Sequence, residues 1–253
     1  MSITTAAYKI ATGGALTTLT IVPPLTDAHV SITANDVLVP DWANKLVAVF
    51  AMGATLTGAQ ITTPSLREIA AMDFSPLNVA ATPNSPPSFV DRFDYPLELK
   101  ASEGLRAYIT SGASENDYVV VFLIDKVDPV PAGAVTTVKY TGTTTVTANA
   151  WSQCALTPSQ QLGAGQWGVV GVRALSTTGI AARLIIPGSP FRPGCIATAS
   201  EGKLDGIGDQ IRFRWGNACL MGTFPHTYPM QAEFLCTAAD TAQTVYLDLV
   251  KVS

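Results

Sequence analysis

The sequence predicts an all-β protein made of two tandem β-sandwiches of similar design. Short runs of alternating or continuous apolar residues recur along all 253 residues, and no stretch keeps a helical period for long. Turns rich in Gly, Pro or Asn-Asp separate these runs. In addition, strand-like segments of the first half recur in the same order in the second half, which is typical of an internal duplication.

The most similar pair of repeated segments is residues 118–127 and 244–252, which end on Lys-Val at an offset of 125 residues (Lys126 to Lys251). Four further matches keep their order while the offset drifts between 114 and 133 residues: 32–35 with 146–149, 46–51 with 167–172, 66–67 with 191–192, and 95–98 with 228–231. Loops absorb such drift more readily than strands. The repeat predicts domains at 1–130 and 131–253, joined by a Pro/Gly-rich seam at 128–133.

Each half offers about seven or eight short strands, the number found in a jelly roll or another β-sandwich. The run 46–66 is expected to form two strands and a turn, and residues 63–71 a short helix capped by Thr63 with Pro64 at its first position. The proline-rich counterpart of this helix, 187–193, cannot be helical. The other expected strands are 8–10, 19–21, 29–33, 97–100, 105–110, 118–127, 135–140, 143–147, 167–174, 181–186, 210–215, 230–236 and 244–252.

The composition is poor in charge. Only 13% of the residues are charged, about half the usual share, and Thr, Ala, Ser and Gly take their place. Such a surface suits a protein that buries much of its outside against copies of itself, although an ordinary β-sandwich with a Thr-rich surface fits equally well. The net charge of −4 and the lack of any Lys/Arg cluster argue against direct nucleic-acid binding.

The chain shows no secretion signal and no membrane-spanning helix, which predicts a protein made in a reducing cytoplasm. Four cysteines, Cys154, Cys195, Cys219 and Cys236, all lie in the second half and lack CxxC spacing. A disulfide framework belonging to a duplicated unit would appear in both halves. We therefore expect buried free thiols rather than disulfides or a zinc site.

Signals for enzymatic chemistry are nearly absent, so we predict a protein that is not an enzyme, with no catalytic residues, no cofactor and no metal ligands. His29 and His226 occupy unrelated positions, no Gly-x-Ser-x-Gly motif occurs, and Gly202-Lys203 lacks the rest of a nucleotide-binding loop. Two acidic groups are expected to be solvated: Asp91, Asp94 and Glu98, and the turn with Asp205 and Asp209. Whether Asp205 and Asp209 bind an ion, as in a calcium-binding turn, stays open.

The tryptophans bear on a binding function. Trp42, Trp151 and Trp215 could line a sugar-binding surface, whereas Trp167 lies at the start of an apolar strand and is expected to pack in the core.

Two similar sandwiches joined by a short seam, with little charge and no active site, resemble the double jelly-roll major capsid proteins of tailless icosahedral viruses, including membrane-containing bacteriophages. The resemblance covers nearly the whole chain through its duplication and strand pattern, and no diagnostic motif supports it. It implies two jelly rolls side by side and a homotrimer of pseudo-hexameric outline that tiles an icosahedral shell. It also implies a place in the virion and, as partners, neighbouring capsomers, minor capsid or penton proteins and an internal membrane.

Within this interpretation, residues 1–25 are either two short strands or an arm that clamps neighbours or faces the membrane. Two other classes of function are kept as alternatives: a phage spike or carbohydrate-binding tandem sandwich, and a duplicated β-barrel enzyme. The first requires an exposed aromatic platform, and the second a bound metal.

Overall fold

The computed structural model describes most of the chain, and the account below concerns these residues. They are 3–11, 13–22, 32–33, 35–67, 72–74, 82–83, 90–92, 95–112, 115–125, 131–199 and 220–253. The chain divides into two compact units, which are Thr4–Asp125 and Lys126–Ser253, the latter together with Met1–Ile3. We call them the N-terminal unit and the C-terminal unit. The predicted boundary at residue 130 lies outside the described residues.

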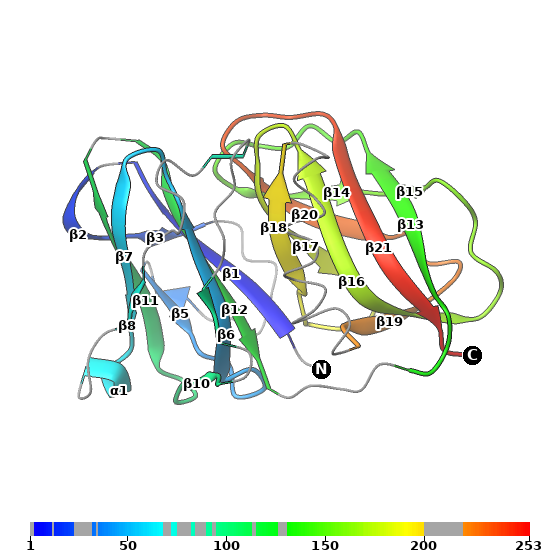
Figure 1. Cartoon of the computed structure of the whole chain (residues 1–253), viewed down its shortest axis with the longest axis horizontal. Coiled ribbons are helices and arrows are strands. Elements are labelled where there is room, and N and C mark those ends of the chain that lie inside the picture. Colours follow the sequence, from blue (N-terminus) through cyan, green and yellow to red (C-terminus); the bar gives the residue numbers. More distant parts are fainter. Residues whose placement is uncertain are drawn as a thin grey trace. The chain divides into compact units, whose positions relative to one another are not determined.

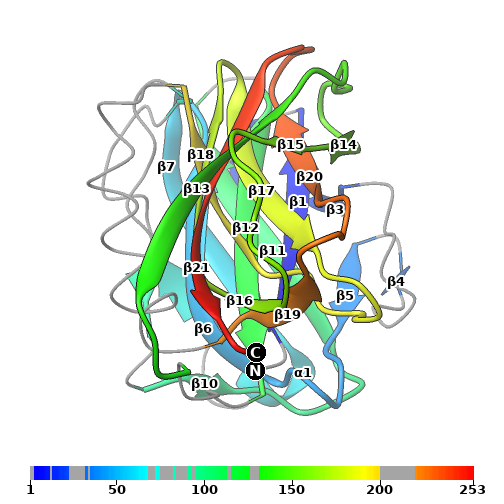
Figure 2. The same cartoon turned by 90° about the vertical axis from the view of Figure 1, so that its right-hand side faces the viewer.

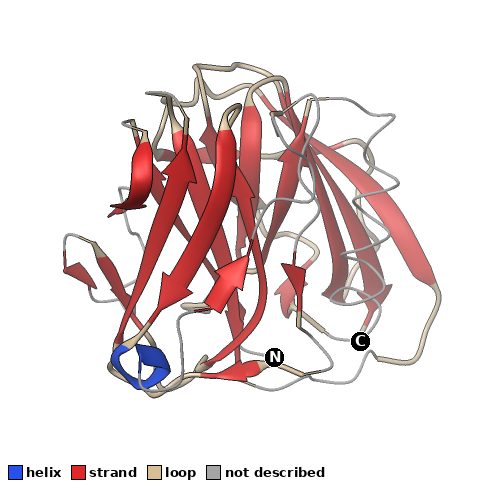
Figure 3. Ribbon diagram, turned by 60° about the vertical axis from the view of Figure 1, so that its left-hand side comes forward, coloured by secondary structure: helices blue, strands red, loops and turns tan. Residues whose placement is uncertain are grey.

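The N-terminal unit is a sandwich of two six-stranded sheets (Figure 1). In one sheet the strand order is β10-β6-β12-β1-β3 with β9 beside β6, and in the other it is β4-β5-β11-β7-β8 with β2 beside β11. The only helix among the described residues is the single turn α1, Pro64–Arg67 (Figure 3). The strands are β1 (Ile3–Ile10), β2 (Gly14–Thr18), β3 (Thr20–Ile21), β4 (Ile32–Thr33), β5 (Asp36–Leu38), β6 (Lys45–Met52), β7 (Leu56–Thr62), β8 (Met72–Phe74), β9 (Val90–Asp91), β10 (Leu97–Glu98), β11 (Gly104–Ser111) and β12 (Asp117–Ile124).

The C-terminal unit is a sandwich whose strands follow the order β14-β20-β17-β18-β16-β21-β13-β15, with β19 beside β16. Its two layers meet where β18 pairs antiparallel with β17 and parallel with β16. Figure 2 shows β13, β21 and β16 side by side in one layer. The strands are β13 (Val135–Gly142), β14 (Trp151–Ala155), β15 (Thr157–Pro158), β16 (Gln166–Ser176), β17 (Gly179–Ile185), β18 (Gly194–Thr198), β19 (Gly222–Pro225), β20 (Gln231–Cys236) and β21 (Gln243–Lys251).

Both units have the same topology. Eight strands correspond in chain order: β1, β2, β6, β7, β8, β9, β11 and β12 in the N-terminal unit, and β13, β14, β16, β17, β18, β19, β20 and β21 in the C-terminal unit. Numbered one to eight, they lie in the order 1-8-3-6 in one layer and 2-7-4-5 in the other, in both units. This is the arrangement of an eight-stranded jelly roll. The predicted fold class, all-β with two tandem jelly rolls, is therefore confirmed.

The two units also share a β-bulge at the same place. In the N-terminal unit the pairing of β12 with β6 passes from Phe122–Ala48 to Leu123–Leu46 and skips Val47. In the C-terminal unit the pairing of β21 with β16 passes from Asp248–Gly171 to Leu249–Val169 and skips Val170. Bulges are retained within families as built features of a sheet. A shared bulge between equivalent strands is what a duplicated ancestor would leave.

The bulge corrects the repeat derived from the sequence. It equates Leu123 with Leu249, an offset of 126 residues, where the sequence match gave 125. A slip of one residue exchanges the two faces of a strand, so the sequence match paired inward-facing with outward-facing side chains. Two other matches are wrong. Residues 32–35 come after β2, but their match, 146–149, comes before β14, which is the equivalent of β2. Residues 97–98 form β10, but their match, 230–231, leads into β20, which is not the equivalent of β10.

The core of the N-terminal unit lies between its two sheets. Alternate residues of β12, namely Val119, Val121 and Leu123, belong to one cluster of buried apolar side chains that also includes residues of β7 and β11. One buried hydrogen bond joins the two sheets: the Tyr8 hydroxyl donates to the Leu105 carbonyl at 2.5 Å. Burial raises the pKa of Tyr8, which keeps the hydroxyl protonated as a donor.

The interpretation of the N-terminus as an arm is wrong for the part of it that is described. Residues 3–8 of β1 are buried, Ile3 and Tyr8 completely, and β1 lies between β12 and β3 in its sheet. The weak alternation of this segment had concealed a strand that is buried on both faces. Deleting residues 1–12 would therefore remove a strand of the N-terminal jelly roll.

Other expectations from the sequence have mixed outcomes. The two strands within 46–66 form as β6 and β7, and the Thr63 hydroxyl accepts a hydrogen bond from the Leu66 amide at 3.2 Å as the predicted N-cap. The strand expected at 143–147 is wrong, because this segment makes only an isolated bridge from Val146 to Asp240 as the chain passes to β14. The strands that were missed are β2, β5, β8, β9, β14, β15, β18 and β19, and 210–215 lies outside the described residues.

Candidate functional site

The sequence-derived candidates do not converge on a reactive site in the described part of the chain. His226 is exposed on a turn, where its Nδ1 accepts a hydrogen bond from the Gly165 amide at 3.3 Å. Glu98 is exposed on β10 and opposite Lys45. No cluster of three or more His, Cys, Asp or Glu side chains occurs among the described residues. His29, Asp94, Gly202-Lys203, Asp205 and Asp209 lie outside the described residues, as does the side chain of Asp91.

Three of the four cysteines are described, and they are buried and free, as predicted: Cys154, Cys195 and Cys236. Burial raises the pKa of Cys195 to about 12, so this thiol stays protonated and unreactive at neutral pH. Cys219 lies outside the described residues. None of the described helices is long and apolar enough to cross a membrane.

The tryptophans differ from expectation. Trp151 is only 2% exposed, so its place in a sugar-binding platform is wrong, and Trp42 packs against the core of the N-terminal unit. Trp167 is half-buried rather than in the core, and its indole N–H donates to the Gly163 carbonyl at 2.9 Å. It lines a cleft of about 460 Å³ together with Thr136, Gln160, Gln161 and Lys251, among others. Trp215 lies outside the described residues.

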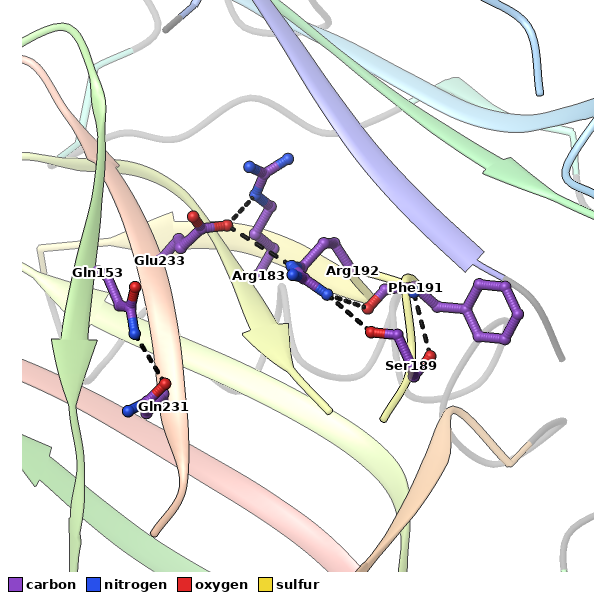
Figure 4. A network of polar contacts seen from close by, with 7 residues as sticks. All are labelled: Gln153, Arg183, Ser189, Phe191, Arg192, Gln231 and Glu233. Carbon is purple, nitrogen blue, oxygen red and sulfur yellow. Dashed lines mark hydrogen bonds and ion pairs between the residues drawn. The ribbon is translucent and has the colours of Figure 1, made fainter. Parts of the chain in front are cut away.

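A polar network in the C-terminal unit (Figure 4) contains two charged side chains that are fully buried. Arg183 on β17 stands directly opposite Glu233 on β20, and its Nε donates to Glu233 Oε2 at 2.7 Å. Both side chains are 0% exposed. The Arg183 guanidinium also lies over the Trp151 ring, 4.3 Å from its centre.

A second guanidinium completes this network. Arg192 Nε lies 3.9 Å from Glu233 Oε2, while Arg192 Nη1 donates to the carbonyls of Ser189 and Phe191 at 3.1 Å each. Glu233 thus lies between two guanidinium groups, which compensate its buried charge. The network therefore fixes β14, β17 and β20 and the turn before β18 rather than performing chemistry.

A second charge cluster lies on the layer of β13, β16 and β21. Asp248 on β21, only 1% exposed, accepts hydrogen bonds from the Thr137 hydroxyl at 2.5 Å and from Arg173 Nη2 at 3.1 Å. The absence of a side chain at Gly171 makes room for it, because a Cβ there would lie 2.6 Å from Asp248 Oδ2. The Lys139 and Arg173 side chains flank the Tyr246 ring at 5.8 and 5.7 Å.

The described polar clusters thus link neighbouring strands. The Thr137 hydroxyl donates to Asp248, but Arg173 binds the same carboxylate oxygen, and neither cluster groups its side chains in an arrangement suited to a cofactor. A rigid scaffold with buried ion pairs is what these residues can provide. Sequence reasoning missed the buried pair of Arg183 and Glu233. The useful signal was a charge at an inward position of an otherwise apolar strand, as in Ala182-Arg183-Leu184 and Ala232-Glu233-Phe234.

Comparisons with solved structures give matches over nearly the full chain. The chain is structurally similar to a viral major capsid protein. This is the major capsid protein P2 of bacteriophage PM2, with 8% identity, 98% of each chain covered and a TM-score of 0.24. A chain of Sulfolobus turreted icosahedral virus also matches, with 10% identity, 100% of this chain and 92% of that chain covered, and a TM-score of 0.26.

At these TM-scores the likeness is too low to bear on the assignment of the fold, which rests on the strand orders of the two units. No family model and no curated protein matches the sequence.

Proposed function

We propose that this chain is a structural protein, the major capsid subunit of a tailless icosahedral virus, and that it closes into pseudo-hexameric homotrimers. The observation that carries the proposal is the presence of two jelly rolls of identical strand order, with the same bulge, in one chain of 253 residues. Three such chains in a ring supply six similar sandwiches. One gene product can then meet near-hexagonal neighbours on every side.

The ring of three chains follows from rotational symmetry. A head-to-tail contact between different faces of one subunit closes into a ring when its rotation fits. Permanent contacts of this kind bury about 2,000 Å² or more. A surface that is poor in charge supports such burial, because few ionised groups would need to be desolvated, and only 13% of this chain is charged.

The proposal includes location and partners. The chain would be made in the host cytoplasm and reside in the virion. It would contact its own copies, neighbouring capsomers and minor capsid or penton proteins, with an internal membrane as a further candidate.

The oligomeric state tests the proposal. Size-exclusion chromatography with light scattering on the purified chain should give a stable species near three times 26.5 kDa, because the trimer is the building block of the shell. It should persist on dilution to micromolar concentration. A clean monomer across that range would contradict the proposed subunit.

A further inference from the structure

A buried carboxylate in the N-terminal unit lacks the partners that the rest of the fold supplies to its charges. Asp117 begins β12 and is 0% exposed, and neither of its side-chain oxygens has a hydrogen-bond partner. It lies on the same face of β12 as Val119 and Val121, at the end of the core between the two sheets. Gly53 accommodates it, because a Cβ at that position would collide with the carboxylate.

A second carboxylate and two hydroxyl groups lie next to Asp117. Glu115 Oε1 accepts hydrogen bonds from the Thr55 amide and from the Thr55 hydroxyl, the latter at 2.9 Å. The Thr55 hydroxyl is also 2.9 Å from the Ser111 hydroxyl. Oxygen atoms from β11, β12 and the β6–β7 turn therefore gather in one place, and no basic side chain is among the groups that shift the pKa of Asp117.

The electrostatics of this cluster are unfavourable without a counter-charge. The pKa of Asp117 is raised to about 7: burial raises it most, the nearby Ser111 hydroxyl lowers it, and the neighbouring Glu115 carboxylate raises it. Removing an ionised carboxylate from water without a partner is strongly unfavourable. A cation beside the buried and unpartnered oxygens of Asp117 would supply the missing counter-charge.

The C-terminal unit provides an internal comparison. The offset of 126 residues that relates β12 to β21 places Gln243 at the position of Asp117. The neutral Gln243 is satisfied: its Nε2 donates to the Asp240 carbonyl at 3.1 Å, and its Oε1 accepts from Cys154 Sγ at 3.2 Å. Only one carboxylate, Asp240, remains there, and it accepts hydrogen bonds from the Ser176 hydroxyl and the Thr177 amide. The charged pair is thus particular to the N-terminal unit.

We propose that the N-terminal unit binds one calcium-like divalent cation between Asp117 and Glu115, with the hydroxyl oxygens of Thr55 and Ser111 as further ligands. Calcium suits this set because it takes six to eight oxygen ligands in flexible geometry, from carboxylates, neutral oxygens and water. The ion would tie the end of β12 to the β6–β7 turn and to β11. This function goes beyond that of a shell subunit and does not depend on it.

The test is calcium titration of the full-length chain, first freed of metal with a chelator that is then removed, by calorimetry at pH 8 and with parallel thermal melts. We expect one equivalent of calcium per chain and a higher Tm with calcium. Asp117→Asn and Glu115→Gln should both lose this equivalent. Asp117→Asn removes the buried charge, so it should fold and melt in chelator at least as high as the wild type. Glu103→Gln is the matched control, because Glu103 binds Ser65 away from the cluster, and it should keep the equivalent.

The pH dependence of stability distinguishes cation binding from the main alternative, in which Asp117 is permanently protonated. The folded pKa of Asp117 lies above its unfolded value, so its contribution to stability in chelator is complete below about pH 4 and is lost as pH rises through about 7. Calcium should restore this loss in the wild type and have no effect in Asp117→Asn. Absence of calcium uptake at pH 8, or an equivalent that Asp117→Asn retains, would overturn the proposal in favour of a neutral acid.

Discussion

Glu233→Gln is expected to lower the free energy of unfolding by about 3–5 kcal/mol, because it leaves the fully buried guanidinium of Arg183 without its carboxylate. Arg192 loses the same neighbour. Urea denaturation at neutral pH, followed by tryptophan fluorescence, measures the effect. Trp151 lies under Arg183 and reports on this region of the C-terminal unit.

The control for this substitution is Glu98→Gln, which removes a carboxylate from an exposed strand position and should change stability by no more than about 0.5 kcal/mol. The double variant Arg183→Met/Glu233→Met removes both charges, and we expect it to recover most of the loss. Equal stability of Glu233→Gln and the wild type would contradict the role given to the buried ion pair.

Leu123→Ala and Leu249→Ala form a matched pair at equivalent positions of the two jelly rolls. Each leucine is 0% exposed and directly follows the shared bulge. Each substitution should cost about 2–5 kcal/mol through lost burial and the cavity that remains. In differential scanning calorimetry Leu123→Ala should lower the transition of the N-terminal unit, and Leu249→Ala that of the C-terminal unit.

Limited proteolysis during the same melts identifies which half opens first. Loss of stability in both halves from either substitution would show that the two cores unfold as one. A much smaller effect for one leucine would contradict the equivalence that the bulge establishes.

The sequence predicted the fold class because the longest strands carry their own signal. β6 and β12 are apolar on both faces. Recognisable turn sequences connect β6 to β7 and β11 to β12. The repeat was detectable for the same reason, since β12 and β21 are both long and Val-rich. Its register was not detectable, because only the paired bulges at Val47 and Val170 reveal which residues share a face.

Short strands escaped prediction for a physical reason. β9 and β15 have two residues each and β19 has four, too few to show a period of two. Tertiary pairing alone makes them strands. The polar clusters escaped for a related reason: Asp117 follows Asn116 and was interpreted as part of a turn, although it is the first residue of a buried strand.

The central claim, that tandem jelly rolls build a pseudo-hexameric capsid subunit, is tested most directly by imaging the purified chain. Class averages of the principal size-exclusion peak in negative stain should show a ring with six similar lobes, which corresponds to three chains of two jelly rolls each. Particles with only two lobes would contradict the claim, because they would show that the two jelly rolls of one chain do not assemble into a ring.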